Sequence, residues 1–246
     1  MFANMSQSTA ARANEGDLST GKIWIICIVT YVAIMLTAAF APDFLQGPGR
    51  NWELGPLESG QNILLLIALV IMLQVAIRAD EKLLRWWMIF VALGTFFLLG
   101  EEASWGQHYF NWETGGWFAQ VNDQGETNFH NTPDGWLDQK PRAILQLGMI
   151  LGAIVHPLVK KFRGGRGIFD NPWWLAPTFA SMPPVIISLI AGLPKAIDKL
   201  EILPFEIQFT RVSEIEELFM YAFFVVYALS LRGRLAYRKA QAAVSS

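Results

Sequence analysis

Six apolar stretches of about 20 residues constrain this chain more than any other feature. They cover residues 23–40, 57–77, 86–105, 143–159, 173–193 and 213–231. An α-helix rises about 1.5 Å per residue, so each stretch is close to the length that crosses roughly 30 Å of hydrocarbon. Only 16% of the residues are charged, against about a quarter in a typical soluble domain. The pattern predicts an all-α, polytopic membrane bundle of about six transmembrane helices.

The distribution of basic residues predicts the orientation of the bundle. Of the 19 Lys and Arg residues, 13 lie in the N-terminal segment, in the loops after the second and fourth stretches, and after the sixth. An excess of Lys and Arg marks the cytoplasmic side of a membrane. We therefore expect both termini to be cytoplasmic in a plasma membrane of the bacterial inner-membrane type.

The chain divides into a membrane domain and two tails. Residues 1–21 are polar and lack the apolar core of a cleavable signal peptide, so we expect a disordered cytoplasmic tail. Residues 22–232 form the six-span membrane domain, and residues 233–246 form a basic cytoplasmic tail. Net charge is only −2, so membrane lipid, and not nucleic acid, is the expected partner.

Residues 106–141 form the one long segment between predicted spans, on the side opposite the termini. A segment of this length in a compact protein is usually functional or disordered. Its apolar content argues against disorder, and Trp is enriched at the headgroup level of membranes. The sequence therefore predicts a folded, outward-facing interfacial cap, whose aromatic residues are Tyr109, Phe110, Trp112, Trp117, Phe118, Phe129 and Trp136.

Two adjacent acids end the third stretch, and polar residues follow them directly. Ionisable groups cost about 2.5–3.5 kcal/mol at the centre of a span by insertion scales, so their presence marks a candidate functional site. If the helix continues past Glu102, Ser104 and His108 are neighbours on one face, whereas Glu101 lies about 10.5 Å from His108 along the axis. We predict catalytic roles for Glu101, Glu102, Ser104 and His108, with Ser104 or His108 serving the substrate or the proton.

Residues 122–131 are dense in amides and contain Glu126 and His130 at positions i and i+4. On a helix this spacing brings a carboxylate and an imidazole to one metal ion or one substrate. A solvated turn region, in which the amides bind loop backbone, is the alternative interpretation. The presence of Phe129 beside His130 indicates partial burial and favours the first.

The sixth stretch opens with three acids. Ser213 and Glu216 match a capping box, which also explains Glu214. Capping explains Glu217 less well, because that residue lies deeper, at the depth expected for Glu101 and Glu102. We therefore predict Glu126, His130 and Glu217 as ligands of a divalent metal ion, with Glu101 or Glu102 as alternatives to Glu217.

Several carboxylates at one depth need a metal ion, an arginine or a shared proton. Arg142 and Arg211 are candidate arginine partners, and a purely structural network that fastens the cap to the bundle is an alternative to chemistry. With one Cys and three His, the chain has neither the thiolates nor the imidazoles for a Cys-based or multi-His metal site.

Three classes of function fit these residues. The leading hypothesis is a membrane-embedded, metal-assisted enzyme that acts on a lipid or another amphipathic substrate. The second is a non-enzymatic accessory or assembly subunit that binds other membrane subunits. The third is a small transporter.

Overall fold

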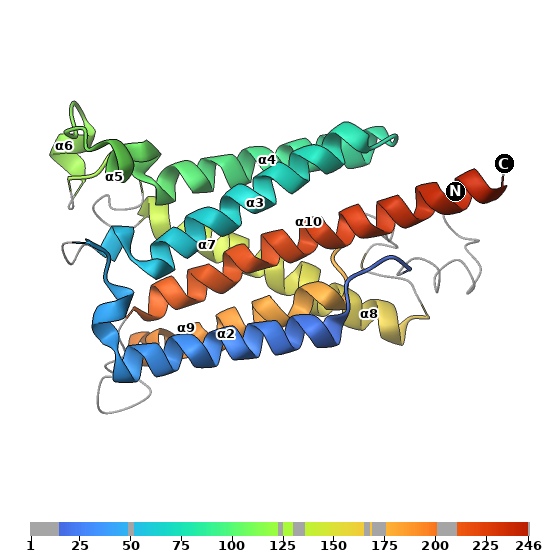
Figure 1. The fold of residues 1–246 in the computed structure, drawn as a ribbon, viewed down its shortest axis with the longest axis horizontal. Helices are drawn as coiled ribbons and strands as arrows, with labels where there is room; N and C mark the ends of the chain where they lie inside the picture. The colour runs from blue at the N-terminus through green and yellow to red at the C-terminus, as the bar shows by residue number, and fades with distance from the viewer. Residues whose placement is uncertain are drawn as a thin grey trace.

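The computed structural model describes residues 15–48, 52–122, 125–129, 136–164, 168, 176–200 and 211–245. Within them the chain forms helices and no strands, which confirms the all-α bundle (Figure 1). Its α-helices are α2 (Thr20–Phe40), α3 (Pro56–Arg78), α4 (Lys82–Glu102), α5 (Gln107–Phe110), α6 (Phe118–Val121), α7 (Trp136–Met149), α8 (His156–Phe162), α9 (Met182–Lys199) and α10 (Val212–Ser245).

Among the described residues, five helical segments are long and apolar enough to cross a membrane, so the protein is membrane-embedded. They are Thr20–Phe40, Pro56–Arg78, Lys82–Glu102, Lys140–Phe162 and Phe179–Lys199. The fourth joins α7 to α8 through a π-helical turn, Ile150–Val155. The sixth predicted span lies within α10, which is not among the five and continues past Leu231 to Ser245.

Two predicted boundaries are wrong, each for a local reason. The third helix ends at Glu102 and not at Trp105, because the chain enters left-handed backbone at Ser104. The fifth helix begins at Met182, where two prolines occupy the first turn and need no intrahelical acceptor. Residues 176–178 of that predicted span are not helical, and residues 171–175 lie outside the described residues. Helix α7 begins at Trp136, within the segment predicted as cap.

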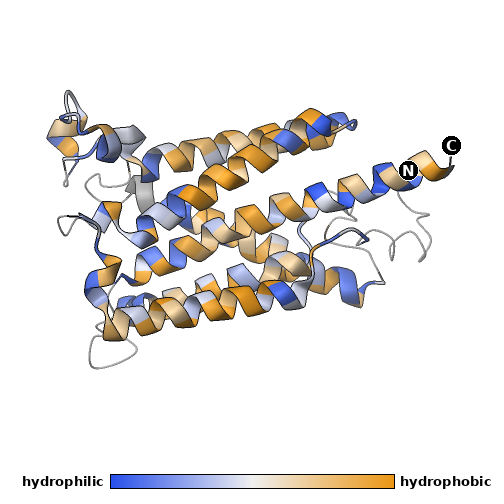
Figure 2. Ribbon diagram, viewed as in Figure 1, coloured by the Kyte–Doolittle hydropathy of each residue, from blue (hydrophilic) through white to orange (hydrophobic). Residues whose placement is uncertain are grey.

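The cap and the start of α2 lie at opposite ends of the bundle. Figure 1 shows α5 and α6 beyond the end of α4, whereas α2 begins toward the opposite end, where α10 extends beyond it. Contacts place the residues before α2 beside this part of α10, since a Cβ added to Gly16 would lie 2.5 Å from the Cβ of Tyr237 in α10. Figure 2 shows apolar residues along the helices and polar residues concentrated at both ends.

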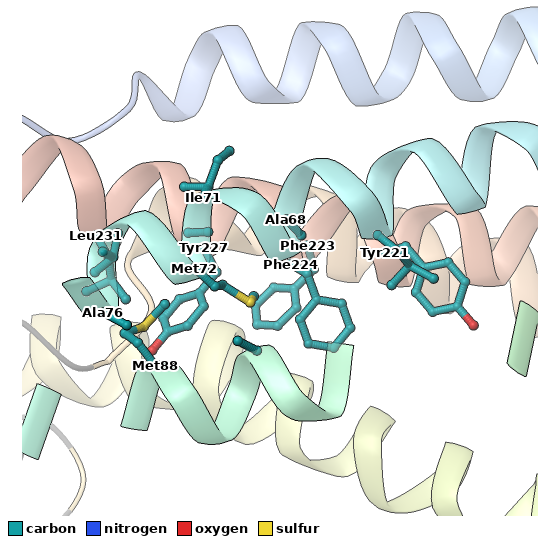
Figure 3. Close-up of a cluster of buried hydrophobic side chains, with 14 of the residues drawn as sticks. Ala68, Ile71, Met72, Ala76, Met88, Tyr221, Phe223, Phe224, Tyr227 and Leu231 are labelled. Carbon is teal, nitrogen blue, oxygen red and sulfur yellow. The ribbon is translucent and has the colours of Figure 1, made fainter. Parts of the chain in front are cut away.

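The core lies where α3, α4 and α10 pack together (Figure 3). Met72 of α3 and Met88 of α4 are fully buried beside Phe224 and Tyr227 of α10. The indole Nε1 of Trp87 donates a hydrogen bond to the Tyr227 hydroxyl over 2.8 Å, which pairs a polar atom inside apolar surroundings. Helix α10 therefore occupies the interior of the bundle and positions its first turns against the cap end.

The arrangement allows a direct test of orientation. We expect a reporter fused after Ser246 to behave as cytoplasmic and one placed between Gly115 and Gly116, in the exposed part of the cap, to behave as external. Alkaline phosphatase and fluorescent-protein fusions measure the two locations. The reverse pattern of activities would contradict the predicted orientation.

Candidate functional site

Glu101 and Glu102 are adjacent in sequence but belong to two different polar clusters. Glu101 points to the cap, where its carboxylate accepts hydrogen bonds from Trp105 Nε1 at 2.9 Å and from the Phe129 backbone N–H at 2.7 Å. Glu102 accepts a hydrogen bond from the Tyr221 hydroxyl of α10 at 2.6 Å. Successive helical side chains point about 100° apart. In the last turn of α4, Glu101 therefore contacts the cap and Glu102 contacts the bundle.

A sharp change of chain direction follows α4. Ser104, Trp105 and Gly106 all have positive φ angles, of 44°, 52° and 99°, a conformation that is uncommon for residues other than glycine. The helix therefore does not continue to His108, yet Ser104 and His108 still meet, because α5 begins directly after the left-handed residues. The reversal turns both side chains toward the loop that contains Glu126.

We call the resulting group the cap cluster; it consists of Glu53, Ser104, His108, Glu126 and Asn128. His108 Nε2 lies 2.8 Å from Ser104 Oγ, 3.4 Å from Glu126 Oε1 and 3.9 Å from Glu53 Oε2. One imidazole nitrogen therefore faces a hydroxyl group and two carboxyl groups. Glu53 comes from the 3-10 turn Trp52–Leu54, which precedes α3.

Buried amides fix the position of the Glu126 carboxylate. Asn128 Nδ2 donates to Glu126 Oε2 and to Ser104 Oγ, each over 2.8 Å. Asn122 Nδ2 donates to Asn128 Oδ1 over 3.0 Å, and Asn122 Oδ1 accepts from the Glu126 backbone N–H over 2.9 Å. Within the described part of the amide-rich segment, Asn122, Glu126 and Asn128 are all buried and are therefore not solvated turn residues.

The geometry differs from that of a serine–histidine–acid triad. In such a triad the acid binds Nδ1 of the imidazole, while the serine faces Nε2. In the cap cluster Ser104 and Glu126 both approach Nε2 of His108. The arrangement does not match the triad.

Three of these residues offer ligand atoms of the kind that bind a divalent cation. Glu53, His108 and Glu126 each offer one ligand atom, and these atoms lie within 4.8 Å of one another. Two ligand atoms about 2.1 Å from a tetrahedral metal ion are about 3.4 Å apart, which matches the separation of His108 Nε2 and Glu126 Oε1. Glu53 Oε2 lies 3.9 Å from His108 Nε2, so Glu53 would have to move closer to complete such a set.

The electrostatic surroundings of Glu53 connect the cap cluster to the bundle. Burial raises the pKa of Glu53 above its ordinary value, and the charge of Glu126 raises it further, whereas His108 and Arg211 lower it. The carboxyl group therefore retains a proton to higher pH than an exposed glutamate does. Positive charge placed near Glu53 favours the ionised form of its carboxyl group.

A second group, the interhelical cluster, lies between α3, α4, α7 and α10. It consists of Glu58, Gln61, Glu102, Arg142, Arg211, Glu214, Glu216, Glu217 and Tyr221. Arg142 pairs with two acids of α10, since Nη2 lies 3.0 Å from Glu216 Oε2 and Nη1 lies 2.5 Å from Glu217 Oε1. The expected role of Arg142 as a partner for these acids is confirmed.

Arg211 makes the corresponding contacts to α3. Its Nη2 atom binds Glu58 Oε1 and lies 3.7 Å from Glu214 Oε1. Its guanidinium carbon lies 5.2 Å from the ring centroid of Trp52, a favourable cation–π distance. Because Trp52 is next to Glu53, this arginine joins the interhelical cluster to the turn that supplies the cap cluster.

The predicted capping box at the start of α10 is wrong. The helix begins at Val212, so Ser213 lies within its first turn, and the Ser213 hydroxyl accepts a hydrogen bond from Lys195 Nζ at 2.9 Å. Glu216 is bound to Arg142 and Gln146 of α7. Glu216, which the sequence pattern assigned to capping, therefore pairs with the charged Arg142 of a neighbouring helix.

The structure divides the predicted site residues into groups. It brings Ser104, His108 and Glu126 together, places Glu101 beside them on Phe129, and places Glu102 and Glu217 in the interhelical cluster. His130 lies outside the described residues, and residues 125–129 before it are not helical. Sequence reasoning did not identify Glu53 or Asn128. The available signal for Glu53 was that it is an acid beside Trp52, just before a span, on the same side as the cap.

Gly192 of α9 allows a test of the packing around Glu216. A Cβ atom at this position would lie 2.7 Å from Glu216 Oε1 and 2.8 Å from its Cδ atom. Because Arg142 and Gln146 hold that carboxylate, we expect Gly192→Ala to lower the free energy of unfolding by about 1–3 kcal/mol through overpacking. Thermal unfolding in detergent measures the change.

Gly94→Ala in α4 is the matched control, because nothing lies within 4 Å of a Cβ added there. Replacing a mid-helix glycine by alanine in open space is worth about 0.5–1 kcal/mol of added stability. Equal effects of the two substitutions would contradict the described packing of α9 on Glu216.

The fold and the site together define a membrane-embedded helical bundle with a polar, carboxylate- and histidine-containing centre under a folded cap. No protein-family model matches the chain, and no curated protein or solved structure matches it significantly.

Proposed function

We propose that the protein binds a divalent metal ion between Glu53, His108 and Glu126 and uses it in a reaction on a lipid or another amphipathic substrate. The observation that carries this proposal is the approach of one ligand atom from each residue to within 4.8 Å of the others. These three residues come from distant parts of the sequence, so their convergence is a property of the fold.

The nature of the ligand atoms indicates the class of metal. One imidazole nitrogen and two carboxylate oxygens suit Zn²⁺ and other first-row divalent ions. Three protein ligands leave a coordination position open, as in catalytic zinc sites. A metal ion in such a site lowers the pKa of a bound water molecule to about 7 or polarises a carbonyl or phosphoryl group.

The groups around the ligands fit the same role. Asn128 orients Glu126 through a 2.8 Å hydrogen bond, and carboxylate ligands are commonly held by such outer contacts. Ser104, with its hydroxyl 2.8 Å from His108 Nε2, is placed to bind a substrate group or a proton. Glu101 accepts a hydrogen bond from the Phe129 backbone N–H and so holds the loop that contains Glu126.

The position of the cap favours an amphipathic substrate. The cap cluster follows the end of α4, one of the five apolar helices. Phe110 and Trp112 are exposed and stacked, with ring centroids 6.1 Å apart, and exposed aromatic residues are typical of the headgroup level. A substrate with an apolar tail in the bilayer would present its polar group at this depth.

A structural role is the second candidate. Ser104, Asn122 and Asn128 satisfy Glu126 through protein contacts alone. Such a network fastens the cap to the bundle and suits an accessory subunit of a membrane complex. In that case the purified protein contains no bound metal, and substitutions in the cap cluster lower its stability.

Elemental analysis separates the two candidates. Protein purified in detergent and incubated with Zn²⁺ or Mn²⁺ is passed through a desalting column and its metal content is measured. About one metal ion per chain supports the metal-dependent function; wild-type protein without bound metal contradicts it and favours the structural role.

A further inference from the structure

We propose that Trp105 is a positioning residue for Glu126. Through the carboxylate of Glu101 it fixes the loop 125–129, which contains Glu126, on the turn that follows α4. This inference rests on the proposed metal site, because Glu126 is one of the three ligands there. Trp105 is not itself a ligand; it acts through Glu101 and the backbone of Phe129.

The carboxylate of Glu101 joins two segments that are far apart in the sequence. Its Oε1 atom accepts a hydrogen bond from Trp105 Nε1 over 2.9 Å, and its Oε2 atom accepts one from the Phe129 backbone N–H over 2.7 Å. The residue is buried. A carboxylate is an acceptor at both oxygens, whereas a side-chain amide has one acceptor oxygen and one donor NH₂ group. Both contacts together therefore suit a glutamate and not a glutamine.

The same loop is attached to the turn at a second point. Asn128 Nδ2 donates to Ser104 Oγ and to Glu126 Oε2, each over 2.8 Å. Ser104 directly precedes Trp105, and Asn128 directly precedes Phe129. Neighbouring residues of the turn therefore hold neighbouring residues of the loop. Two such contacts fix the orientation of a segment as well as its position, whereas one contact leaves it free to turn.

The backbone of the turn provides an independent argument. Ser104 and Trp105 have φ angles of 44° and 52°, in the left-handed region that residues other than glycine rarely adopt. Glycine adopts this conformation without steric cost, but it has no side chain with which to bind the loop. Strained residues persist where surrounding contacts hold them, and they are concentrated at functional sites. The contacts of the Ser104 hydroxyl and the Trp105 indole fit this explanation, because both lead to the loop that contains Glu126.

Packing on α4 sets the orientation of the Trp105 indole. A Cβ atom added to Gly100 would lie 2.8 Å from Cη2 and from Cζ3 of the indole, so the ring lies directly on the glycine. The ring also meets those of Phe96 and Phe97 edge-on, with centroids 6.0 Å and 6.2 Å away, an arrangement that aromatic pairs favour. The helix therefore holds the indole N–H in the place where it binds Glu101.

Amide hydrogen exchange tests the attachment in metal-free protein. Trp105→Phe keeps a six-membered ring against Gly100 but removes the N–H donor, so the Glu101 carboxylate loses one of its two fixed contacts. We expect the Phe129 amide to exchange several-fold faster in this variant than in the wild type, both in lipid nanodiscs. Mass spectrometry of overlapping peptides measures the rates, and equal rates would overturn the proposal.

Calorimetric titration with Zn²⁺ tests the effect on Glu126. Loss of a contact behind a metal ligand weakens metal affinity by about 10–100-fold. We expect Trp105→Phe to weaken Zn²⁺ binding by about tenfold, the lower end of that range, because Trp105 acts through Glu101. A lower melting temperature with unchanged Zn²⁺ affinity would show a purely structural role and overturn the proposal.

Gly100→Ala is a second variant that leaves every polar group in place. The added Cβ displaces the indole, so we expect faster exchange at Phe129 and weaker Zn²⁺ binding here too. Gly94→Ala is its matched control, because nothing lies within 4 Å of a Cβ added there. Equal results for the two glycine variants would contradict the role of the indole.

Trp112→Phe is the control for loss of an indole elsewhere in the cap. Trp112 is 41% exposed, against 40% for Trp105, and stacks on Phe110. We expect Trp112→Phe to leave exchange at Phe129 and Zn²⁺ affinity unchanged. Effects as large as those of Trp105→Phe would overturn the assignment to Trp105.

The two measurements separate this inference from the proposed metal site. A wild type that binds no Zn²⁺ contradicts the metal site, whereas the exchange rate of Phe129 in metal-free protein decides the attachment of the loop by itself. A wild type and a Trp105→Phe variant that bind Zn²⁺ equally well support the metal site and overturn the positioning role.

Discussion

Replacing Glu126 by glutamine is expected to abolish metal binding while leaving a folded, extractable protein. The glutamine amide is nearly the same size and keeps hydrogen-bonding capacity toward Asn128 and Ser104, but it removes the negative charge that faces His108. Loss of an outer-shell partner already weakens metal binding by about 10–100-fold, so loss of a ligand is expected to exceed that. Elemental analysis and calorimetric titration with Zn²⁺ measure the change.

His108→Gln is expected to give the same result, because it removes the one nitrogen ligand of the group. Glu113→Gln is the matched control, since Glu113 is an exposed acid of the same cap. The metal-dependent function is contradicted if the Glu126→Gln protein retains a full equivalent of metal. A large loss of thermal stability in both variants, with no metal in the wild type, would instead establish the structural role.

Arg142→Leu is expected to lower the free energy of unfolding by about 3–5 kcal/mol, because it leaves two buried carboxylates without their arginine. Arg142 binds Glu216 and Glu217, and the side chains of all three are 15% exposed or less. Thermal unfolding of the detergent-solubilised protein, followed by tryptophan fluorescence, measures the loss.

Arg238→Leu controls for the removal of a positive charge. Arg238 pairs with Glu81 over 3.7 Å, and both side chains are more than 40% exposed. Exposed ion pairs contribute only about 0–1 kcal/mol, so little change is expected. If the two substitutions destabilise the protein equally, the Arg142 pairs are not the buried contacts described above.

The fold class was predictable because length and apolarity are properties of continuous sequence. The stretches 23–40 and 57–77 correspond closely to α2 and α3. The start of α9 was harder to predict, because apolar residues such as Ala176 continue the apolar pattern ahead of the first helical residue. The end of α4 depends on the left-handed conformation of Ser104 and Trp105. Serine and tryptophan have a low preference for this conformation, so the sequence did not indicate it.

The candidate site was predictable only in part, for a physical reason. Ser104, His108 and Glu126 stood out because polar residues beside an apolar span need an explanation. Glu53 did not, since its relation to His108 arises from tertiary packing across two helices. The sequence also did not predict that Glu101 and Glu102, or Glu217 and Glu126, belong to different clusters. Depth in the membrane does not specify the direction in which a side chain points.

The interior position of α10 determines the order in which the protein can be completed during synthesis. This helix is synthesised after the other described helices, yet it supplies Glu214, Glu216, Glu217 and Tyr221, which pair with groups on the loop before it and on α4 and α7. Until it arrives, Glu102 and Arg142 lie in a bilayer without these partners. The earlier helices therefore form an unfinished assembly, and a chain cut short before Val212 would be left to the quality-control machinery of the cell.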